Sequence, residues 1–141
     1  MTHSQSTTLG DKAQPLANYP HGKRVGDYIF VSGISSRRPD GSVAGATPNA
    51  AGGHDLDVRL QTEAVIANIR DILASFGAEL SDLCDTTCYL VDMADYAGFN
   101  EVYNRYFDAQ SGPCRTTVAV RELPNPRLNI EVKATAYKPQ R

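Results

Sequence analysis

Two charged residues of the sequence stand where they could do chemistry. Arg115 follows the turn Gly112-Pro113 and opens the run RTTVAVREL, which has the composition of a β-strand. Glu131 lies inside a second such run, LNIEVKATAYK, where a carboxylate is rarely buried without a reason. A guanidinium binds a carboxylate through two parallel hydrogen bonds, and a glutamate can order a water molecule or transfer a proton. Arg115 is therefore a candidate anion-binding residue, and Glu131 a candidate for handling water or a proton.

Both residues also have an interpretation without function, and position alone favours it. Arg115 could be a surface arginine with a loose ion pair, which contributes little. Glu131 could form a cross-strand salt bridge with Arg115, Arg121 or Lys133.

Other polar side chains could contact a ligand. Ser32 ends a strand at a Ser-Gly step, although serine often simply terminates a strand. Asn100 lies among aromatic residues in a predicted helix, where it is either unfavourable or merely exposed. Tyr19, in NYPHG, either packs as a loop aromatic or donates its phenol to a ligand. Cys114 neighbours Arg115, but no histidine is placed to activate it, so we interpret it as a small buried hydrophobic residue.

The composition predicts one soluble globular domain. The 141 residues are 41% hydrophobic and 21% charged, and the formal net charge is -2. This charge favours neither nucleic acid nor an anionic membrane as a partner. No stretch is long and apolar enough for a membrane span, and the polar start MTHSQSTTLGDKAQ lacks the apolar core of a secretion signal. A cytoplasmic location is the resulting expectation.

The cysteines and histidines predict no metal site. The three cysteines are an odd number, which favours free thiols in a reducing compartment. No spacing among the cysteines and histidines matches a set of metal ligands, and no cofactor motif is present, so we expect neither metal nor cofactor. The residues concerned are Cys84, Cys88, Cys114, His3, His21 and His54.

The hydrophobic patterns predict the order β, α, β, α, β, β within a single domain over 16–141, after a flexible arm over 1–15. This order favours a mixed sheet with both helices on one face. The long segment 37–54 reads as a loop with a short strand near Val43. The expected strands are 27–33, 82–92, 115–123 and 128–138, and the expected helices are 55–77 and 95–107.

The last two strands are expected to form a hairpin around the turn PNPR. Alternation then places Ile130 and Val118 on the apolar face beneath the helices, and Arg115 and Glu131 together on the other face. That second face must stay in water or pack against other subunits.

Taken together, these segments resemble the Rid family, also called YjgF, of enamine/imine deaminases. The resemblance runs from about Tyr19 to Tyr137, and its most specific parts are VSG, NEVY, PCRTT and NIEV. It implies an α+β, chorismate-mutase-like fold: a mixed sheet with two helices on one face. It also implies a homotrimeric barrel with three clefts between subunits, and leaves open whether trimers pair into hexamers.

The resemblance also implies roles for individual residues. Arg115 matches the carboxylate-binding arginine and Glu131 the glutamate that positions the hydrolytic water. The implied activity is that of a hydrolase which converts a small enamine or imine carboxylate into a 2-oxo acid and ammonia without a cofactor. The implied substrate-binding positions are Tyr19, Ser32, Gly33, Asn100 and Thr117, the last being Cys in some members.

The stretch YPHGKRVGDYIFVSGISSRRPDGSVAGA resembles more narrowly the 2-aminomuconate deaminases of aromatic-compound breakdown, which form 4-oxalocrotonate. Their substrate has a second, distal carboxylate, which Arg37, Arg38, Arg24 or His21 could meet. The alternatives are a broad deaminase of 2-aminoacrylate and similar compounds, and a non-catalytic ligand-binding trimer. The acidic balance argues against a third alternative, an RNA-acting protein.

Overall fold

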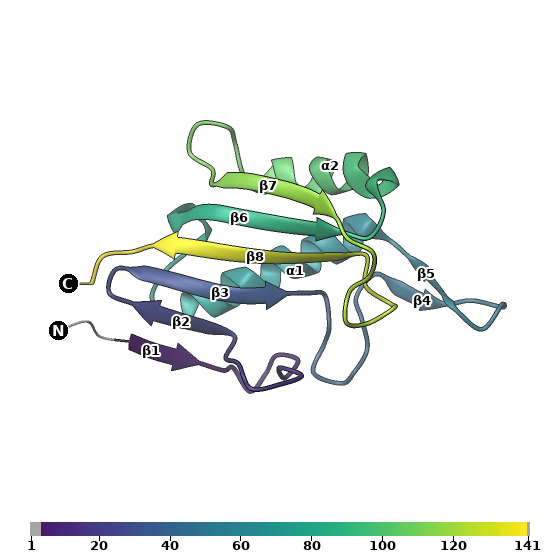
Figure 1. Cartoon of the computed structure of the whole chain (residues 1–141), viewed down its shortest axis with the longest axis horizontal. Helices are drawn as coiled ribbons and strands as arrows, with labels where there is room; N and C mark the ends of the chain where they lie inside the picture. The colour runs from purple at the N-terminus through teal and green to yellow at the C-terminus, as the bar shows by residue number, and fades with distance from the viewer. Residues whose placement is uncertain (1–3, 141) are drawn as a thin grey trace.

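The computed structural model describes residues 4–140, which form one six-stranded sheet, one small hairpin and two helices (Figure 1). The strands are β1 (Ser4–Thr7), β2 (Gly22–Val25), β3 (Tyr28–Ile34), β4 (Ala46–Pro48), β5 (His54–Leu56), β6 (Leu83–Leu90), β7 (Cys114–Ala119) and β8 (Ile130–Tyr137). The helices are α1 (Val58–Ala74) and α2 (Tyr96–Tyr106), with short 3-10 turns at η1 (Leu80–Asp82) and η2 (Met93–Asp95).

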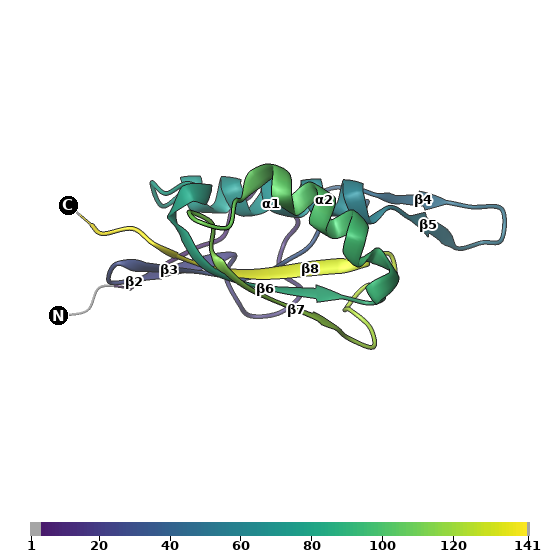
Figure 2. The same ribbon diagram turned by 90° about the horizontal axis from the view of Figure 1, so that it is seen from above.

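The large sheet has the strand order β1-β2-β3-β8-β6-β7. Its neighbours are antiparallel except β6 and β7, which are parallel because α2 forms the crossover between them. Figure 2 shows both helices on one face of the sheet, and no helix of residues 4–140 lies on the other face. The expected α+β fold, a mixed sheet with two helices on one face, is therefore confirmed.

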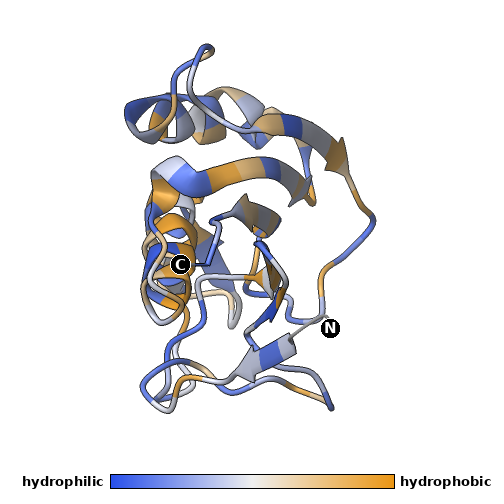
Figure 3. Cartoon of the chain, turned by 90° about the vertical axis from the view of Figure 1, so that its left-hand side faces the viewer, coloured by the Kyte–Doolittle hydropathy of each residue, from blue (hydrophilic) through white to orange (hydrophobic). Residues whose placement is uncertain are grey.

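Alternation along the strands puts the core between the sheet and the helices. Ile130, Val132, Ala134 and Ala136 of β8 are buried, while the residues between them are more exposed. Figure 3 shows this alternation of apolar and polar residues along the strands. The buried apolar residues of α1, which include Val65, Ile69 and Ile72, pack on the same core. Asp57 caps the start of this helix, because its side chain accepts hydrogen bonds from the free backbone N–H groups of Arg59 and Leu60.

The expected hairpin of the last two strands is wrong, because β6 lies between β7 and β8. Arg115 is paired with Thr86, whose buried side chain contacts α2, so Arg115 points to the helix face. Glu131 lies between the buried Ile130 and Val132 and points to the open face. Arg115 and Glu131 are thus on opposite faces of the sheet rather than together on one.

Short polar strands account for the elements that the patterns missed. Residues 4–7 of the expected arm form β1 at the sheet edge, and β2 joins it to β3, whereas residues 1–3 lie outside the described residues. Within the expected loop, Arg37 and Val43 form a single bridge. The β4–β5 hairpin extends beyond the end of α1 (Figure 2).

The open face carries large side chains that no part of the described chain covers. Tyr28, Phe30 and Tyr137 remain more than 40% exposed, and the rings of Tyr28 and Tyr137 are in edge contact at 5.2 Å. Val118 on β7 is 40% exposed on the same face. Neither helix of residues 4–140 has the length and hydropathy that a membrane span requires.

Candidate active site

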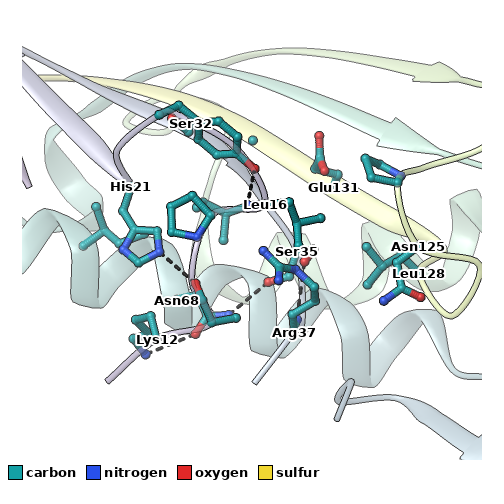
Figure 4. Close-up of a pocket in the computed structure, with 17 residues that line it drawn as sticks. Lys12, Leu16, His21, Ser32, Ser35, Arg37, Asn68, Asn125, Leu128 and Glu131 are labelled. Atoms are coloured by element: carbon teal, nitrogen blue, oxygen red, sulfur yellow. Dashed lines mark hydrogen bonds between the residues drawn. The ribbon is translucent and has the colours of Figure 1, made fainter. Parts of the chain in front are cut away.

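A pocket lies where β3 runs past the end of β2 and the loop before β2 folds over it (Figure 4). Six of the residues singled out in the sequence line this pocket: Tyr19, His21, Ser32, Gly33, Arg37 and Glu131. We call this pocket the glutamate pocket.

A bulge in β3 shapes the pocket. The pairing of β3 with β8 shifts register between Val31 and Ile34, so Ser32 and Gly33 together face a single step of β8. A Cβ atom on Gly33 would lie 2.5 Å from Oε2 of Glu131. Glycine at this position therefore allows the carboxylate to lie directly against the β3 backbone. The Ser32 hydroxyl donates to the Pro20 carbonyl at 2.8 Å, which ties the pocket's wall to β3.

Glu131 is a carboxylate without an ion pair among residues 4–140. Burial raises its pKa above the usual range of a glutamate, and the nearby charge of Arg37 opposes that rise. The cross-strand salt bridge considered from the sequence is absent from this part of the chain. A half-buried carboxylate with a raised pKa can exchange a proton nearer to neutral pH.

Arg115 lies on β7, an edge strand of the sheet, and its side chain packs on aromatic rings. Its Cζ atom is 4.8 Å from the ring centre of Tyr103, 4.9 Å from that of Phe99 and 5.7 Å from that of Tyr96. Its Nη2 donates to the Tyr96 hydroxyl at 3.1 Å. Within residues 4–140 it forms no salt bridge, so most of its donors stay free for an anion. We call Arg115 and these three rings the arginine cradle.

Two polar side chains beside the arginine cradle lack a partner. The Asn100 Oδ1 and Thr117 Oγ1 atoms are buried and form no hydrogen bond within the described chain. Asn100 follows Phe99 in α2, and Thr117 lies on the same side of β7 as Arg115. The two elements that carry the cradle, α2 and β7, thus each contain a buried oxygen atom without a hydrogen-bond partner, a feature that calls for a ligand.

The two groups do not meet within one chain. Glu131 is paired with Tyr89, and Tyr89 with Val118, which is three residues beyond Arg115 on β7. Two strand spacings and three residues correspond to about 14 Å between the backbones at Glu131 and Arg115. The side chains also point to opposite faces, so the glutamate pocket and the arginine cradle are separate half-sites.

Of the four residues considered for a distal carboxylate, Arg37 is the arginine that lines the glutamate pocket. Its side chain lines the glutamate pocket and donates one hydrogen bond, from Nη2 to the Gln14 carbonyl at 3.1 Å. Arg38 is exposed outside the pocket and donates to Ser42. Arg24 is buried and donates to the carbonyls of Gly26, Phe76 and Lys138, where it fixes the end of α1.

His21 lines the pocket, but both of its ring nitrogens are engaged. Nδ1 accepts from the Leu9 backbone N–H and Nε2 lies 2.9 Å from the Ala13 carbonyl. A contact between His21 and substrate stays a prediction, and both ring nitrogens are engaged with the loop before β2. The phenol of Tyr19 lies at the exposed rim and accepts weakly from the Leu16 N–H at 3.4 Å.

The cysteines contribute no site. Cys88 is buried, and burial raises the pKa of its thiol to about 11. Cys114 is exposed, which corrects its interpretation as a buried hydrophobic residue, and it points away from Arg115 by strand alternation. Within residues 4–140, no cluster of His, Cys, Asp and Glu side chains could hold a metal ion.

The sequence did not indicate the rings of the arginine cradle. The three rings belong to the predicted helix 95–107, but their residue types and spacing alone indicate no ligand-binding role. Their spacing of three and four residues places all three side chains on neighbouring faces of α2. The only available signal was that an arginine would follow them at the start of the next strand.

Solved structures with the same architecture cover nearly the whole chain. The yeast protein YEO7 superimposes with a TM-score of 0.82 at 26% identity, covering 96% of this chain and 99% of that one. A putative endoribonuclease from Thermotoga maritima superimposes with a TM-score of 0.81 at 28% identity, covering 96% and 98%. The fold is thus of the YjgF, chorismate-mutase-like class.

The sequence comparisons identify the family. The family described as Endoribonuclease L-PSP matches residues 10–138. A RutC family protein of Pyrococcus abyssi is 40% identical over 125 residues, covering 89% of this chain and 90% of the relative. Reactive Intermediate Deaminase A, chloroplastic, of Arabidopsis thaliana is 36% identical over 85% of this chain and 59% of that protein. The chain belongs to the Rid/YjgF family.

Proposed function

We propose that the protein is a hydrolase that deaminates 2-amino-2-enoates, with 2-aminomuconate as its substrate. The enamine takes up a proton at carbon to become the imine, water adds to the imine carbon, and ammonia leaves. The product is a 2-oxo acid, 4-oxalocrotonate in the case of 2-aminomuconate. One water molecule enters and one ammonia leaves, so the reaction has no redox step. The Arabidopsis relative, which is named a reactive intermediate deaminase, supports this reaction type.

The chemistry of the arginine cradle supports this class of substrate. A guanidinium with free donors suits the carboxylate next to the reacting carbon. The unpaired oxygens of Asn100 and Thr117 are acceptors, and they suit the N–H groups of the neighbouring amine. A carboxylate and an amine on one carbon are what define a 2-amino-enoate.

The observation that carries the proposal is the division of the site between two separate places on one chain, β7 with α2 and the pocket beside β3 and β8. The arginine cradle offers charge but no group that handles water, and the glutamate pocket offers a proton-exchanging carboxylate. We propose a homotrimer in which the cradle of one chain faces the glutamate pocket of the next. The uncovered aromatic residues of the open face and the exposed Val118 supply apolar surface for such an assembly.

A mixing experiment tests the shared site. Arg115→Ala and Glu131→Gln should each be nearly inactive alone, because every site in either trimer lacks one group. After unfolding and refolding as an equal mixture, one site in four combines an intact Arg115 with an intact Glu131, so activity should return to about a quarter of the wild-type value. An equal mixture that stays inactive, although native mass spectrometry detects mixed trimers, would refute a site shared between chains.

The finer substrate assignment depends on Arg37. With Arg115 on the near carboxylate, Arg37 in the glutamate pocket is placed to bind the distal one. Arg37→Ala should raise KM for 2-aminomuconate about tenfold or more, because one charge-assisted hydrogen bond is lost. Turnover of 2-aminoacrylate, which has no distal carboxylate, should change little.

Arg38→Ala is the matched control for Arg37→Ala, since it removes the same charge one residue away and outside the pocket. Turnover is followed by the loss of dienamine absorbance for 2-aminomuconate and by ammonia release for 2-aminoacrylate. Equal effects of Arg37→Ala on both substrates would contradict the role of Arg37 and favour a broad deaminase.

A further inference from the structure

The loop of residues 8–20, which joins β1 to β2, forms one wall of the glutamate pocket and carries Tyr19. We call it the 8–20 loop. In the described chain, the hydrogen bonds between this loop and the rest of the protein all involve a side chain. They link Leu9 and Ala13 to His21, Lys12 to Asn68 and Asp71, Gln14 to Arg37, and Pro20 to Ser32.

His21 holds this loop at two points. Its side chain is only 4% exposed, and the 2.9 Å contacts of its two ring nitrogens reach Leu9 and Ala13, on either side of the first turn of the loop. The Leu9 N–H can only donate and the Ala13 carbonyl can only accept. The ring must therefore be neutral, with its hydrogen on Nε2 and its lone pair on Nδ1.

A second proton on the ring would break this arrangement. Protonated Nδ1 becomes a donor and would face the Leu9 N–H, which is also a donor. The ring is buried, so water cannot replace the lost acceptor without movement of the loop. The contact between Nδ1 and Leu9 therefore depends on the protonation state of one side chain.

We propose that His21 is a positioning residue: its neutral ring holds the 8–20 loop, and with it Tyr19, over the glutamate pocket, and uptake of a proton releases the loop. The site would then be closed while the ring is neutral and open once the ring is protonated. The effect on catalysis rests on the proposed function, whereas the movement of the loop does not.

The other charged and titratable groups around the pocket come from several elements. The loop itself brings Lys12 and Tyr19, and α1 brings Asp71, which pairs with Lys12 at 2.5 Å. Arg37 lies in the segment after β3, and Glu131 on β8.

Hydrogen exchange measured by mass spectrometry tests the release directly. Peptides from the 8–20 loop and from α1 are compared between pH 8 and pH 5, after correction for intrinsic exchange rates. In the wild-type protein, protection of the loop should fall by about tenfold or more in acid while α1 stays protected. Unchanged loop protection, or equal loss in α1, would overturn the proposal, and neither result needs a variant.

Two variants separate the charge from the hydrogen bonds. In His21→Gln, the carboxamide offers one acceptor and one donor and never becomes charged, so loop protection should persist and no longer depend on pH. In His21→Leu, the loop should exchange rapidly at every pH. A His21→Gln protein that still loses loop protection in acid would place the titrating group elsewhere.

The kinetic readout shows whether the release matters for catalysis. In acid, KM of the wild-type protein should rise in addition to the fall in kcat. In His21→Gln, the rise in KM should be absent and the fall in kcat should remain. Normal exchange behaviour in a protein that deaminates nothing at any pH would refute the proposed function and leave the role of His21 intact.

Discussion

Replacement of Arg115 by alanine should lower kcat/KM for enamine carboxylates by about a hundred- to a thousandfold, the usual effect of losing a charge that stabilises the reacting group. The guanidinium lies over three rings with most of its donors unused, so its loss removes the carboxylate contact. Arg115→Lys should rescue little, because an ammonium cannot form two parallel hydrogen bonds. Initial rates on 2-aminomuconate and on 2-aminoacrylate measure the effect.

The control for Arg115 is Arg121→Ala, which removes an exposed arginine just beyond the same strand and should leave the rate unchanged. Light scattering and thermal unfolding establish that the Arg115→Ala protein keeps the wild-type assembly and fold. Wild-type activity in a well-folded Arg115→Ala protein would disprove the role of the arginine cradle.

Replacement of Glu131 by glutamine should lower kcat by about a hundredfold or more, the scale of general acid–base catalysis. Glutamine keeps the shape that fits against Gly33 but cannot exchange a proton. The carboxylate form is the one that accepts a proton from water, so the activity of the wild-type enzyme should fall as pH drops through the pKa of Glu131. Because burial raises that pKa, the fall should begin above the pH at which an ordinary glutamate titrates.

A pH profile of kcat tests this role, because release of the 8–20 loop is expected to act on KM. In Arg37→Ala the acid limb of this profile, which is the fall in activity at low pH, should move to higher pH. The reason is that the charge of Arg37 opposes the rise of the Glu131 pKa. The limb should disappear in Glu131→Gln, and Glu122→Gln, at an exposed glutamate, should reproduce the wild-type profile. An acid limb that survives in Glu131→Gln would have to come from another group.

Local patterns were sufficient for the elements that form the core. The stripe through Val65, Ile69 and Ile72 predicted α1, although the helix is shorter at each end than the expected 55–77 because Asp57 caps it and Ser75 ends it. The alternation in β8 also predicted its buried face. The strands β1, β2, β4 and β5 were missed because segments such as SQST and HDL are short and polar and lack an alternating apolar pattern.

The face of the sheet on which Arg115 lies could not be predicted from the sequence, for a related reason. The turn PNPR has the composition of a hairpin turn, but the chain crosses β6 there, and the parallel pairing of β6 with β7 depends on where α2 packs. The more apolar residues of β7, such as Val118, then face away from the helices. Alternation predicts two faces of an edge strand but not which of them the rest of the chain covers.

The glutamate pocket was more accessible to sequence reasoning than the arginine cradle. Ser32, Gly33 and Glu131 were singled out, and adjacent strands bring them together. The choice of Arg37 among the four candidate residues required the structure. Only the contacts show that the side chains of Arg24 and His21 are hydrogen-bonded to backbone groups.

The separation of Arg115 from Glu131 has a consequence for how such an enzyme behaves at low concentration. When its two reacting groups come from different chains, an isolated chain has no turnover of its own, so specific activity must decline on dilution once subunits part. A newly made chain is correspondingly inert until it finds others. The rate of catalysis would thus fall more steeply than the concentration of the protein.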